Sequence, residues 1–557
     1  MFPSQLKKIL LLAGAVILAA SICAAQTIGS ANTVTADPPV VRPSTTPCVV
    51  HLFDAVAFAD FSPKPFTFTP PADCPGPWAK VVLEADFSIN NGRQFDRTAN
   101  IWIGGANVYF GTTAEPSHDV SRSWHVERDL TDYSSLLSTS QSGLVILGNL
   151  VNSTFTSILM GSADLEFYPV APHQSAPVTA DQVLPLSAGP DGGTVSLQTS
   201  ASQLSGTFSL PMNIERAFLD VVAQSQSNDE FWYSCVPNDV AAELQNCGGS
   251  GFRETEVSID GQPAGVAPVY PWIYTGGIDP LLWRPIPGVQ TLNFVPYRVD
   301  LSPFAGILSN GVQHTIALSV FNANFSFSTT ANLLLYLDHG AGRTFGGVTV
   351  NTLTAAPTPN VQENIATDSS GNITGSVNVT SARQYTINGW VQTSHGRVNT
   401  TESVGINFVN DQQFDITASL FGQNLQQKTT IAAATTRAGG GVNETSVQKF
   451  DWPLNFNFAF VANPDGTFAQ TTTIDQEDNE SKLVTDHGRT AFLSTLSNIV
   501  TPRDTLLFDA NFNVTGGQNQ SNAQRYFTRD STGYCYSRQL TAASGVLTSV
   551  TDGVGCK

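Results

Sequence analysis

Apolar and polar side chains alternate with a period of two residues along much of this chain. Apolar residues occupy every second position from Val81 to Ile89, again from Trp452 to Phe460, and again from Leu506 to Val514. This period puts all the apolar side chains on one face of a β-strand, whereas an α-helix would scatter them around its axis. Few segments have a helical period. The pattern therefore predicts an all-β protein built from antiparallel strands with one buried face.

Two stretches rich in Pro and Gly divide the chain. The first runs from Ala171 to Gly193, and the second from Thr354 to Pro359. We expect tandem antiparallel jelly-roll-like β-sandwiches over 46–172 and 185–350, followed by an additional β-rich C-terminal domain over 360–557. Periodicity alone favours a sandwich for this third unit too. Residues 26–45 are rich in Thr, Pro and Ala, and we expect a flexible leader there.

The N-terminus has the features of an export signal. Lys7 and Lys8 precede a short apolar run from Ile9 to Ile22, and the small residues before Gln26 suit cleavage after Ala25. We therefore expect residues 1–25 to be a signal peptide and the mature protein to be secreted or periplasmic. The alternative is an uncleaved membrane anchor, but the run is short for a membrane span. No later segment is long and apolar enough to cross a bilayer.

The charge balance excludes two classes of partner. The 557 residues include 26 Lys and Arg against 45 Asp and Glu, for a net charge of −19. A nucleic-acid binder needs cationic side chains to neutralise phosphates, and attachment to anionic lipid also needs them. We expect no nucleic-acid partner, no membrane association after signal cleavage, and a monomer.

Six cysteines remain after cleavage, in three pairs that are close in sequence: Cys48 with Cys74, Cys235 with Cys247, and Cys535 with Cys556. Six cysteines permit fifteen pairings, so spacing does not prove these three. An oxidising compartment makes the local pairing the simplest hypothesis. The chain has no CxxC, no HExxH and no close pair among its eight histidines, so we expect no metal site and no cofactor.

Two stretches depart from plain alternation. Arg93, Asp96 and Arg97 follow a turn signal and precede a strand, which places them at the rim of a sheet. Between Asp229 and Tyr233, two carboxylates precede three aromatic residues. A sugar site uses such a pairing, because an aromatic ring packs on the sugar face and a carboxylate takes a hydroxyl or a proton. The alternative is a salt bridge at a strand end beside core aromatics, and composition alone favours that alternative.

Six strings in order resemble the plant peptide-N4-(N-acetyl-β-glucosaminyl)asparagine amidase A family, the A-type peptide:N-glycanases. The strings are Gly92–Arg97, Ile101–Gly105, Thr113–Pro116, Leu147–Leu150, Asp229–Tyr233 and Gly276–Pro285. The likeness runs from about Cys48 to Asp300 and continues more weakly to the C-terminus. It implies an amidase that hydrolyses the glycosylated asparagine side chain and releases N-glycans from peptides and proteins.

The stretch from Asp96 to Ile101 is also similar to the flavobacterial F-type enzyme of the same activity. That likeness implies two adjacent eight-stranded jelly rolls with the site between them. It implies that Asp96 is the main catalytic carboxylate, with Arg97 beside it as a substrate-binding residue. Glu230 resembles the catalytic glutamate of the second domain, and Arg284 resembles a substrate-binding arginine.

One further F-type site glutamate is replaced here by Asn149, which can hydrogen-bond a sugar or water but cannot titrate. Either two carboxylates suffice, or Glu115 or Glu127 substitutes for the third. Trp232 is the aromatic residue expected to pack against the chitobiose core, with Trp283 as a second candidate.

Two other functions compete with the amidase. A glycoside hydrolase with paired carboxylates would leave one sugar on the asparagine. A non-catalytic carbohydrate-binding β protein would explain the composition and the export signal equally well, but it would not explain the Arg93–Arg97 cluster joined to the A-type strings.

Overall fold

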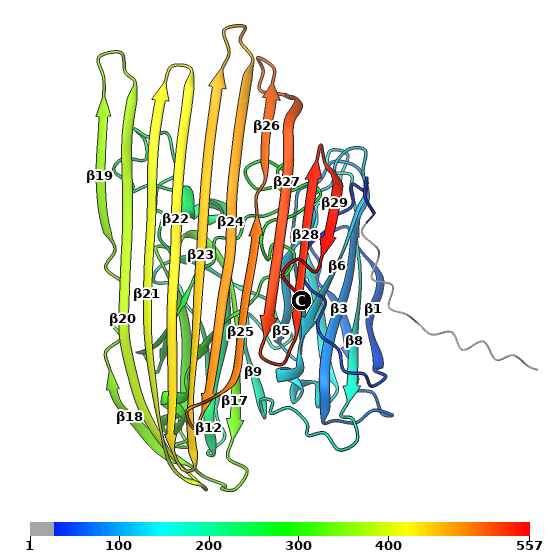
Figure 1. The fold of residues 1–557 in the computed structure, drawn as a ribbon, viewed down its shortest axis with the longest axis vertical. Coiled ribbons are helices and arrows are strands. Elements are labelled where there is room, and N and C mark those ends of the chain that lie inside the picture. Colours follow the sequence, from blue (N-terminus) through cyan, green and yellow to red (C-terminus); the bar gives the residue numbers. More distant parts are fainter. Residues whose placement is uncertain (1–26, 557) are drawn as a thin grey trace, which may run out of the picture.

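The computed structural model describes residues 27–556, and this part of the chain is composed almost entirely of antiparallel strands (Figure 1). The prediction of an all-β fold is therefore confirmed. The expected signal peptide, 1–25, lies outside the described residues. None of the helices between residues 27 and 556 has the length and apolar character that a membrane span requires.

The first unit is a sandwich of two four-stranded sheets, with strand orders β1-β8-β3-β6 and β2-β7-β4-β5. Its core contains the apolar positions that alternation predicts, since Val81, Leu83 and Phe87 are buried. The strands are β1 (Cys48–Phe58), β2 (Lys64–Phe68), β3 (Trp78–Ile89), β4 (Thr98–Ile103), β5 (Ala106–Thr112), β6 (Arg122–Asp129), β7 (Gln141–Leu147) and β8 (Leu159–Pro169). Two 3-10 turns, η1 (Thr131–Tyr133) and η2 (Leu136–Ser138), join β6 to β7.

The second unit repeats this strand order. Its sheets run β10-β17-β12-β15, with β9 beside β17, and β11-β16-β13-β14. Counted from β10, the order matches that of the first unit strand for strand, as expected for two jelly-roll-like sandwiches with Greek-key connections. The strands are β9 (Gln182–Leu186), β10 (Val195–Thr199), β11 (Leu204–Ser209), β12 (Ile214–Ser225), β13 (Glu254–Ile259), β14 (Gln262–Pro268), β15 (Tyr297–Asp300), β16 (Gln313–Phe321) and β17 (Asn324–Leu337). Its short helical turns are η3 (Ser227–Asp229), η4 (Trp232–Ser234), η5 (Ser302–Phe304) and α1 (Ala305–Leu308).

The two sandwiches are joined by buried hydrogen bonds. Tyr109 Oη donates to the Leu292 carbonyl at 2.6 Å. Asn332 Nδ2 donates to the Asn107 carbonyl at 2.9 Å, and Tyr133 Oη donates to Asp220 Oδ2 at 2.8 Å. Because these groups are buried, leaving them unpaired would be costly, so the bonds fix how the sandwiches sit against each other.

The third unit is β-rich, as predicted, but it is one twelve-stranded sheet rather than a third sandwich (Figure 1). It begins at Phe345, within the range expected for the second sandwich. The order is β18-β20-β21-β22-β23-β24-β25-β27-β28-β29, with β19 beside β20 and with β26 paired to β24 and β27. The strands are β18 (Phe345–Asn351), β19 (Asn360–Thr367), β20 (Ile373–Thr393), β21 (Gly396–Thr417), β22 (Leu420–Gly439), β23 (Val442–Ala462), β24 (Phe468–Asp486), β25 (Arg489–Val500), β26 (Arg503–Phe508), β27 (Val514–Asp530), β28 (Cys535–Ala543) and β29 (Val546–Asp552).

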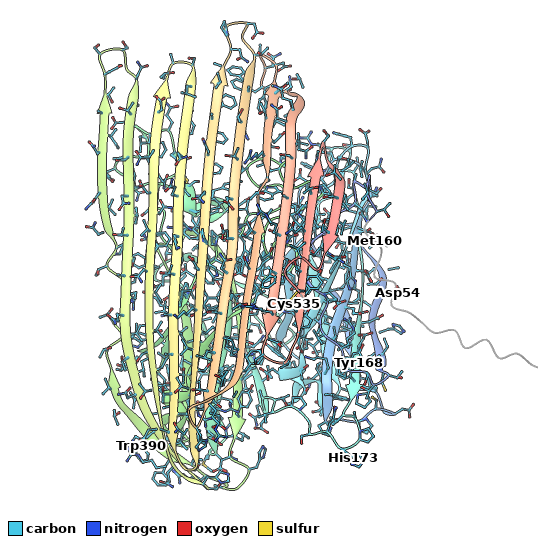
Figure 2. The ribbon with its side chains drawn as sticks, viewed as in Figure 1. Asp54, Met160, Tyr168, His173, Trp390 and Cys535 are labelled. Atoms are coloured by element: carbon cyan, nitrogen blue, oxygen red, sulfur yellow. A yellow bond between two sulfur atoms is a disulfide. The ribbon has the colours of Figure 1, made fainter. Side chains whose placement is uncertain are left out.

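One face of this sheet covers the second sandwich and shares its hydrophobic core, while the other face bears the alternating exposed residues (Figures 1 and 2). Amide side chains on the inner face bond to loop carbonyls of the second sandwich. Asn410 donates to the Tyr233 carbonyl at 2.7 Å, and Asn522 donates to the Leu282 carbonyl at 2.8 Å. Loops need partners for their backbone groups. The sheet therefore braces the two loops, 226–235 and 276–286, that carry Glu230 and Arg284.

Residues 27–45 have no helix or strand, but they are not the free leader that their composition suggested. Ala36 is fully buried, and its N–H donates to Gln524 Oε1 at 2.6 Å. Arg42 forms ion pairs with Glu127 and Glu166, each at 2.8 Å. The segment thus lies as a strap between the C-terminal sheet and the first sandwich. Composition could not show this, because the partners are distant in sequence.

Two of the three expected disulfides are present, Cys235–Cys247 and Cys535–Cys556 (Cys535 is labelled in Figure 2). The third expected disulfide, Cys48–Cys74, is absent, and both residues are free thiols. They lie beside each other. Burial and the neighbouring Cys48 thiol raise the pKa of Cys74 to about 11, which favours its protonated form.

Candidate active site

Asp96 lies in the loop that leads from β3 into β4, at the rim that the sequence predicted. Its Oδ2 accepts a hydrogen bond from the Gly276 N–H of the second sandwich at 2.9 Å. Burial raises the pKa of Asp96, while the Gly276 N–H and the Arg97 guanidinium favour its ionised form. A carboxylate of the first sandwich is thus fixed by the backbone of the second.

Glu115 also approaches Gly276. A Cβ added to Gly276 would lie 2.0 Å from Glu115 Oε2 and 3.0 Å from Asp96 Oδ1. The Glu115 N–H also donates to Thr275 Oγ1 at 2.9 Å. Residue 276 must therefore lack a side chain so that both carboxylates can reach the same point on the backbone.

Burial raises the pKa of Glu115 to about 8, and the negative charge of Asp96 adds to the rise. Arg284 opposes it, with Nη2 at 3.9 Å from Glu115 Oε1. Arg284 is held in place by a 2.7 Å hydrogen bond from Nη2 to the Pro116 carbonyl. Near neutral pH, Glu115 is mainly a protonated acid, able to donate a proton.

Glu230 follows β12 and the short turn η3, which starts at Ser227 with a φ of 53°. Burial raises the pKa of Glu230 to about 7, and the charge of Asp96 is the second cause. Asp96 thus raises the pKa of two other carboxyl groups. Perturbed carboxyl groups that influence one another in this way are typical of catalytic sites, although ion-pair networks also produce them.

The neighbouring acid, Asp229, has a different task. It is fully buried and pairs with Arg253 at 2.9 Å. Its Oδ2 accepts the backbone N–H groups of Asn324 and Ser326 at 2.8 and 3.0 Å. Asp229 therefore anchors the turn, and Glu230 is the acid of this pair whose pKa the charge of Asp96 raises.

Arg97 donates from Nη2 to Gln94 Oε1 at 2.7 Å, and burial lowers its pKa. The Nε atoms of Arg97 and Arg284 are buried, and neither has a hydrogen-bond partner among residues 27–556. Each guanidinium therefore keeps one N–H without a hydrogen-bond acceptor in this part of the chain.

Two residues near the carboxyl groups have no role that the sequence indicates. Gly276 belongs to the string Gly276–Pro285, but nothing in the sequence gives it a function of its own. Tyr274 Oη bonds to the Ser225 carbonyl, and the charges of Glu230 and Asp96 help burial to raise its pKa. Both residues lie in the connection between β14 and β15, and their proximity to Asp96 depends on the packing of the two sandwiches.

The structure does not support the prediction that Trp232 or Trp283 packs against a sugar. Trp232 is fully buried and packs on Phe408 of the C-terminal sheet, with ring centroids 6.4 Å apart. Trp283 is also buried, and its Nε1 donates to the Gly277 carbonyl at 2.9 Å. Neither ring is free to stack on a sugar, because the C-terminal sheet and the 276–286 loop enclose them.

The structure does not support the predicted substrate-binding role of Asn149 either. Its side chain is fully buried, and Nδ2 donates to the Phe58 carbonyl at 3.0 Å and the Ser157 carbonyl at 3.2 Å. It braces the loop after β7 instead of reaching toward a ligand.

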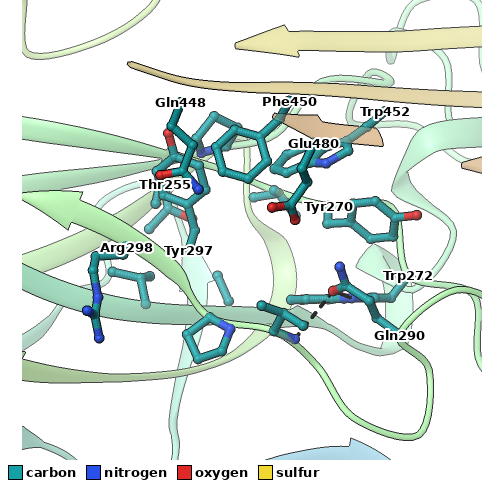
Figure 3. Close-up of a pocket in the computed structure, with 17 residues that line it drawn as sticks. Thr255, Tyr270, Trp272, Gln290, Tyr297, Arg298, Gln448, Phe450, Trp452 and Glu480 are labelled. Carbon is teal, nitrogen blue, oxygen red and sulfur yellow. Dashed lines mark hydrogen bonds between the residues drawn. The ribbon is translucent and has the colours of Figure 1, made fainter. Parts of the chain in front are cut away.

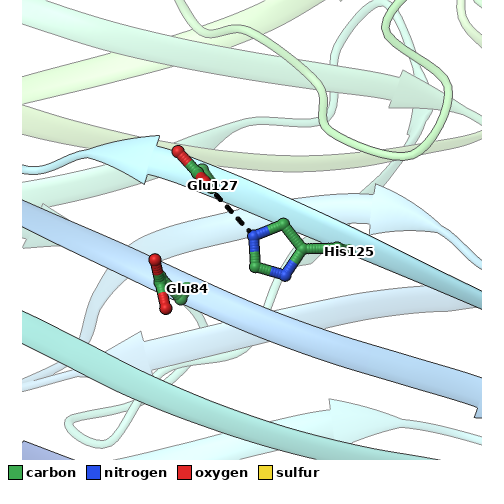
Figure 4. Close-up of side chains that lie close together, drawn as sticks. All are labelled: Glu84, His125 and Glu127. Carbon is green, nitrogen blue, oxygen red and sulfur yellow. Dashed lines mark hydrogen bonds and ion pairs between the residues drawn. The ribbon is translucent and has the colours of Figure 1, made fainter. Parts of the chain in front are cut away.

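Glu127, the other possible replacement carboxylate, belongs to a separate cluster with Glu84 and His125 (Figure 4). Burial opposes its ionisation, but hydrogen bonds from His125, Arg42 and the Val40 N–H prevail and lower its pKa to about 2. The geometry of the three side chains would suit a metal ion, but the Arg42 guanidinium pairs with both Glu84 and Glu127 and supplies the positive charge there. Of the two alternatives, Glu115 lies beside Asp96 and Glu127 does not.

Comparison with known proteins agrees with the resemblance. The family model described as peptide N-acetyl-beta-D-glucosaminyl asparaginase amidase A matches residues 38–353. Peptide-N4-(N-acetyl-beta-glucosaminyl)asparagine amidase A of Prunus dulcis is 30% identical over 542 residues, which cover 93% of this chain and 91% of that protein.

Two solved structures are also similar. PNGase F, a glycosylasparaginase from Flavobacterium meningosepticum, aligns over 52% of this chain and 96% of its own, at 15% identity and a TM-score of 0.35. PNGF-II aligns over 52% of this chain and 66% of its own, at 14% identity and a TM-score of 0.36.

The chain is thus an all-β protein whose two sandwiches together supply a cluster of interacting carboxyl groups. From the extent of the matched model and of the Prunus relative, it belongs to the peptide N-acetyl-β-D-glucosaminyl asparaginase amidase A family.

Proposed function

We propose that this protein hydrolyses the side-chain amide of N-glycosylated asparagine, releasing the intact N-glycan and leaving aspartate in the peptide. The observation that carries the proposal is the approach of Asp96 and Glu115 to Gly276, with Glu230 close enough for Asp96 to raise its pKa. Family membership supports the same reaction, and it makes N-glycosylated peptides and proteins the substrates.

An amide is a weak electrophile with a poor leaving group, so water must be activated and the departing nitrogen must be protonated. Burial raises the pKa of Asp96, which makes its carboxylate a stronger base, and the Gly276 N–H and Arg97 support the ionised form against burial. In this proposal Asp96 takes the proton of the attacking water. Glu115 is mainly protonated, so it delivers a proton to the departing nitrogen. Glu230 positions the water and the amide.

The negative charge on the carbonyl oxygen needs a positive donor in the transition state. The guanidinium charges of Arg97 and Arg284 both interact with Glu115, and one of them fills this role. The first products are an aspartate and a 1-amino glycan. A second water then replaces the amino group, giving the free glycan and ammonia.

The test uses one glycopeptide and reads the masses of both products. Conversion of the glycosylated asparagine to aspartate, with release of an intact glycan, is the expected result. A peptide that keeps one N-acetylglucosamine would identify a glycoside hydrolase instead, and no cleavage by the folded protein would leave a binding protein.

Asp96→Asn supplies the residue-level test, with Asp86→Asn as its control because the Asp86 side chain is 71% exposed on β3. We expect Asp96→Asn to abolish glycan release while the control keeps it. A folded Asp96→Asn protein with near-normal release would contradict the assignment.

We also propose that the protein is exported, is cleaved after Ala25 and acts as a monomer. The sequence of residues 1–25 supports export, and one chain supplies all the site residues. Sequencing the mature N-terminus tests the cleavage, with Gln26 expected first, and light scattering tests the monomer.

A further inference from the structure

A partly open pocket lies apart from the carboxyl cluster, between the second sandwich and the C-terminal sheet (Figure 3). Its volume is about 110 Å³. One wall comes from β12, β13, β14, β15 and the connection between β14 and β15, and the other comes from β23 and β24. The space is partly open, so the head of a larger molecule can enter it while the rest of that molecule stays outside.

Five aromatic rings surround the space: Tyr270, Trp272, Tyr297, Phe450 and Trp452. They contact one another at varied angles. Tyr270 and Trp452 meet edge to face at 5.2 Å, and Tyr297 and Phe450 are tilted at 5.4 Å.

The polar atoms of three of these rings are already bonded to the protein. Trp452 Nε1 donates to Asp478 Oδ1 at 2.9 Å. Tyr270 Oη donates to the Glu477 carbonyl at 3.0 Å, and Trp272 Nε1 donates to Gln290 Oε1 at 3.2 Å. These rings therefore offer a ligand their faces, which carry the negative part of the aromatic quadrupole.

Glu480 projects its carboxyl group among these rings (Figure 3). No side chain of residues 27–556 forms a hydrogen bond or a close ion pair with that carboxyl group; Lys482 exerts only a longer-range attraction. Arg298, the other charged residue in the lining, is engaged by Asp220 at 2.7 Å and Asp132 at 2.5 Å. Burial and the nearby charge of Asp478 raise the pKa of Glu480 to about 8. The space thus combines ring faces with one acidic group that has no cationic partner beside it among the described residues.

We propose that this cavity binds a small organic cation with a methylated ammonium head, held by the faces of the aromatic rings and by Glu480. Ring faces attract cations, and they do so more strongly where water is excluded. The methyl groups fill the apolar volume, and the positive charge favours the ionised form of Glu480, which burial otherwise keeps mainly protonated near neutral pH. A neutral sugar fits less well, because the Gln290 side chain is already occupied by Trp272 and Asp478.

The test titrates the whole protein with choline and, separately, with 3,3-dimethylbutan-1-ol, its uncharged isostere, at constant ionic strength. Calorimetry and tryptophan fluorescence report binding, because two tryptophans line the space. We expect choline to bind at least about tenfold more tightly than the alcohol. Equal affinity for the two compounds, or no saturable binding of choline, would overturn the proposal.

Glu480→Gln keeps the shape and removes the charge, and we expect it to weaken choline binding by about tenfold. The matched control is Glu477→Gln, on the same strand but bonded to Asn479 at 2.7 Å; it should bind choline normally. Phe450→Leu is a second variant that keeps apolar bulk, and it should weaken choline more than the alcohol. Unchanged choline binding in both Glu480→Gln and Phe450→Leu would also overturn the proposal.

Discussion

Gly276 and Asp96 are joined by a 2.9 Å hydrogen bond between the backbone N–H of one sandwich and a carboxylate of the other. The same glycine leaves room for Glu115, whose Oε2 would lie 2.0 Å from any added Cβ. Two acids are thereby positioned by a residue that has no side chain. The relationship explains why the proposed site exists only when the two sandwiches are packed together.

Gly276→Ala should damage the proposed activity more than it damages the fold. Its new methyl group must displace Glu115 or the backbone, and a misplacement of about 1 Å can cost about 100-fold in rate. We expect kcat/KM for a glycopeptide to fall by about that factor. Gly405→Ala is the control, since nothing lies within 4 Å of its added Cβ. Equal activity in the two variants would contradict this role for Gly276.

The pH dependence of glycan release should follow Glu115. If its protonated form donates to the leaving nitrogen, kcat should fall as the pH rises through about 8. Arg284 lowers this pKa, so Arg284→Gln should move the alkaline limb to higher pH even if its overall rate is reduced. The measurement is a rate profile from pH 5 to 10 for both proteins. A limb that stays in place would argue against Glu115 as the acid.

Much of this molecule was predictable from local pattern, and the remainder depends on pairings that are remote in sequence. Alternation predicts a strand but not its neighbour, so it could not distinguish a sandwich from the single sheet that begins at Phe345. Trp232 lies in an acidic and aromatic string that suits a sugar site, but the C-terminal sheet covers it. The sequence could not choose between Glu115 and Glu127 as the replacement carboxylate, because Glu127 is paired with Arg42, which is distant in sequence.

The adjacent acids Asp229 and Glu230 should respond to substitution in opposite ways. Asp229→Asn leaves Arg253 buried without its counter-charge, and breaking a buried ion pair costs about 3–5 kcal/mol in the free energy of unfolding. Glu230→Gln removes no such pair, so we expect near-normal stability with strongly reduced glycan release. Urea unfolding and a glycopeptide assay on both variants test this, and a stable Asp229→Asn protein would contradict the anchoring role.

Stability should fall as the pH rises from about 5 to 8, because carboxyl groups with raised pKa values favour the protonated folded state. Glu115, at about 8 against an ordinary 4.5, binds more proton when folded than when unfolded throughout this interval. Its contribution is complete below about pH 4.5 and is lost as the pH passes through 8. Glu230, at about 7, acts in the same direction.

Glu115→Gln should therefore flatten this dependence, by up to about 1.4 kcal/mol per pH unit, and should make the protein more stable than the wild type near pH 8. Denaturant unfolding at several pH values measures the slope. Asp60→Asn is the control, because Asp60 is exposed and its pKa is lowered by Lys64, the opposite direction. Parallel curves for wild type and Glu115→Gln would show that Glu115 is not held protonated in the folded protein.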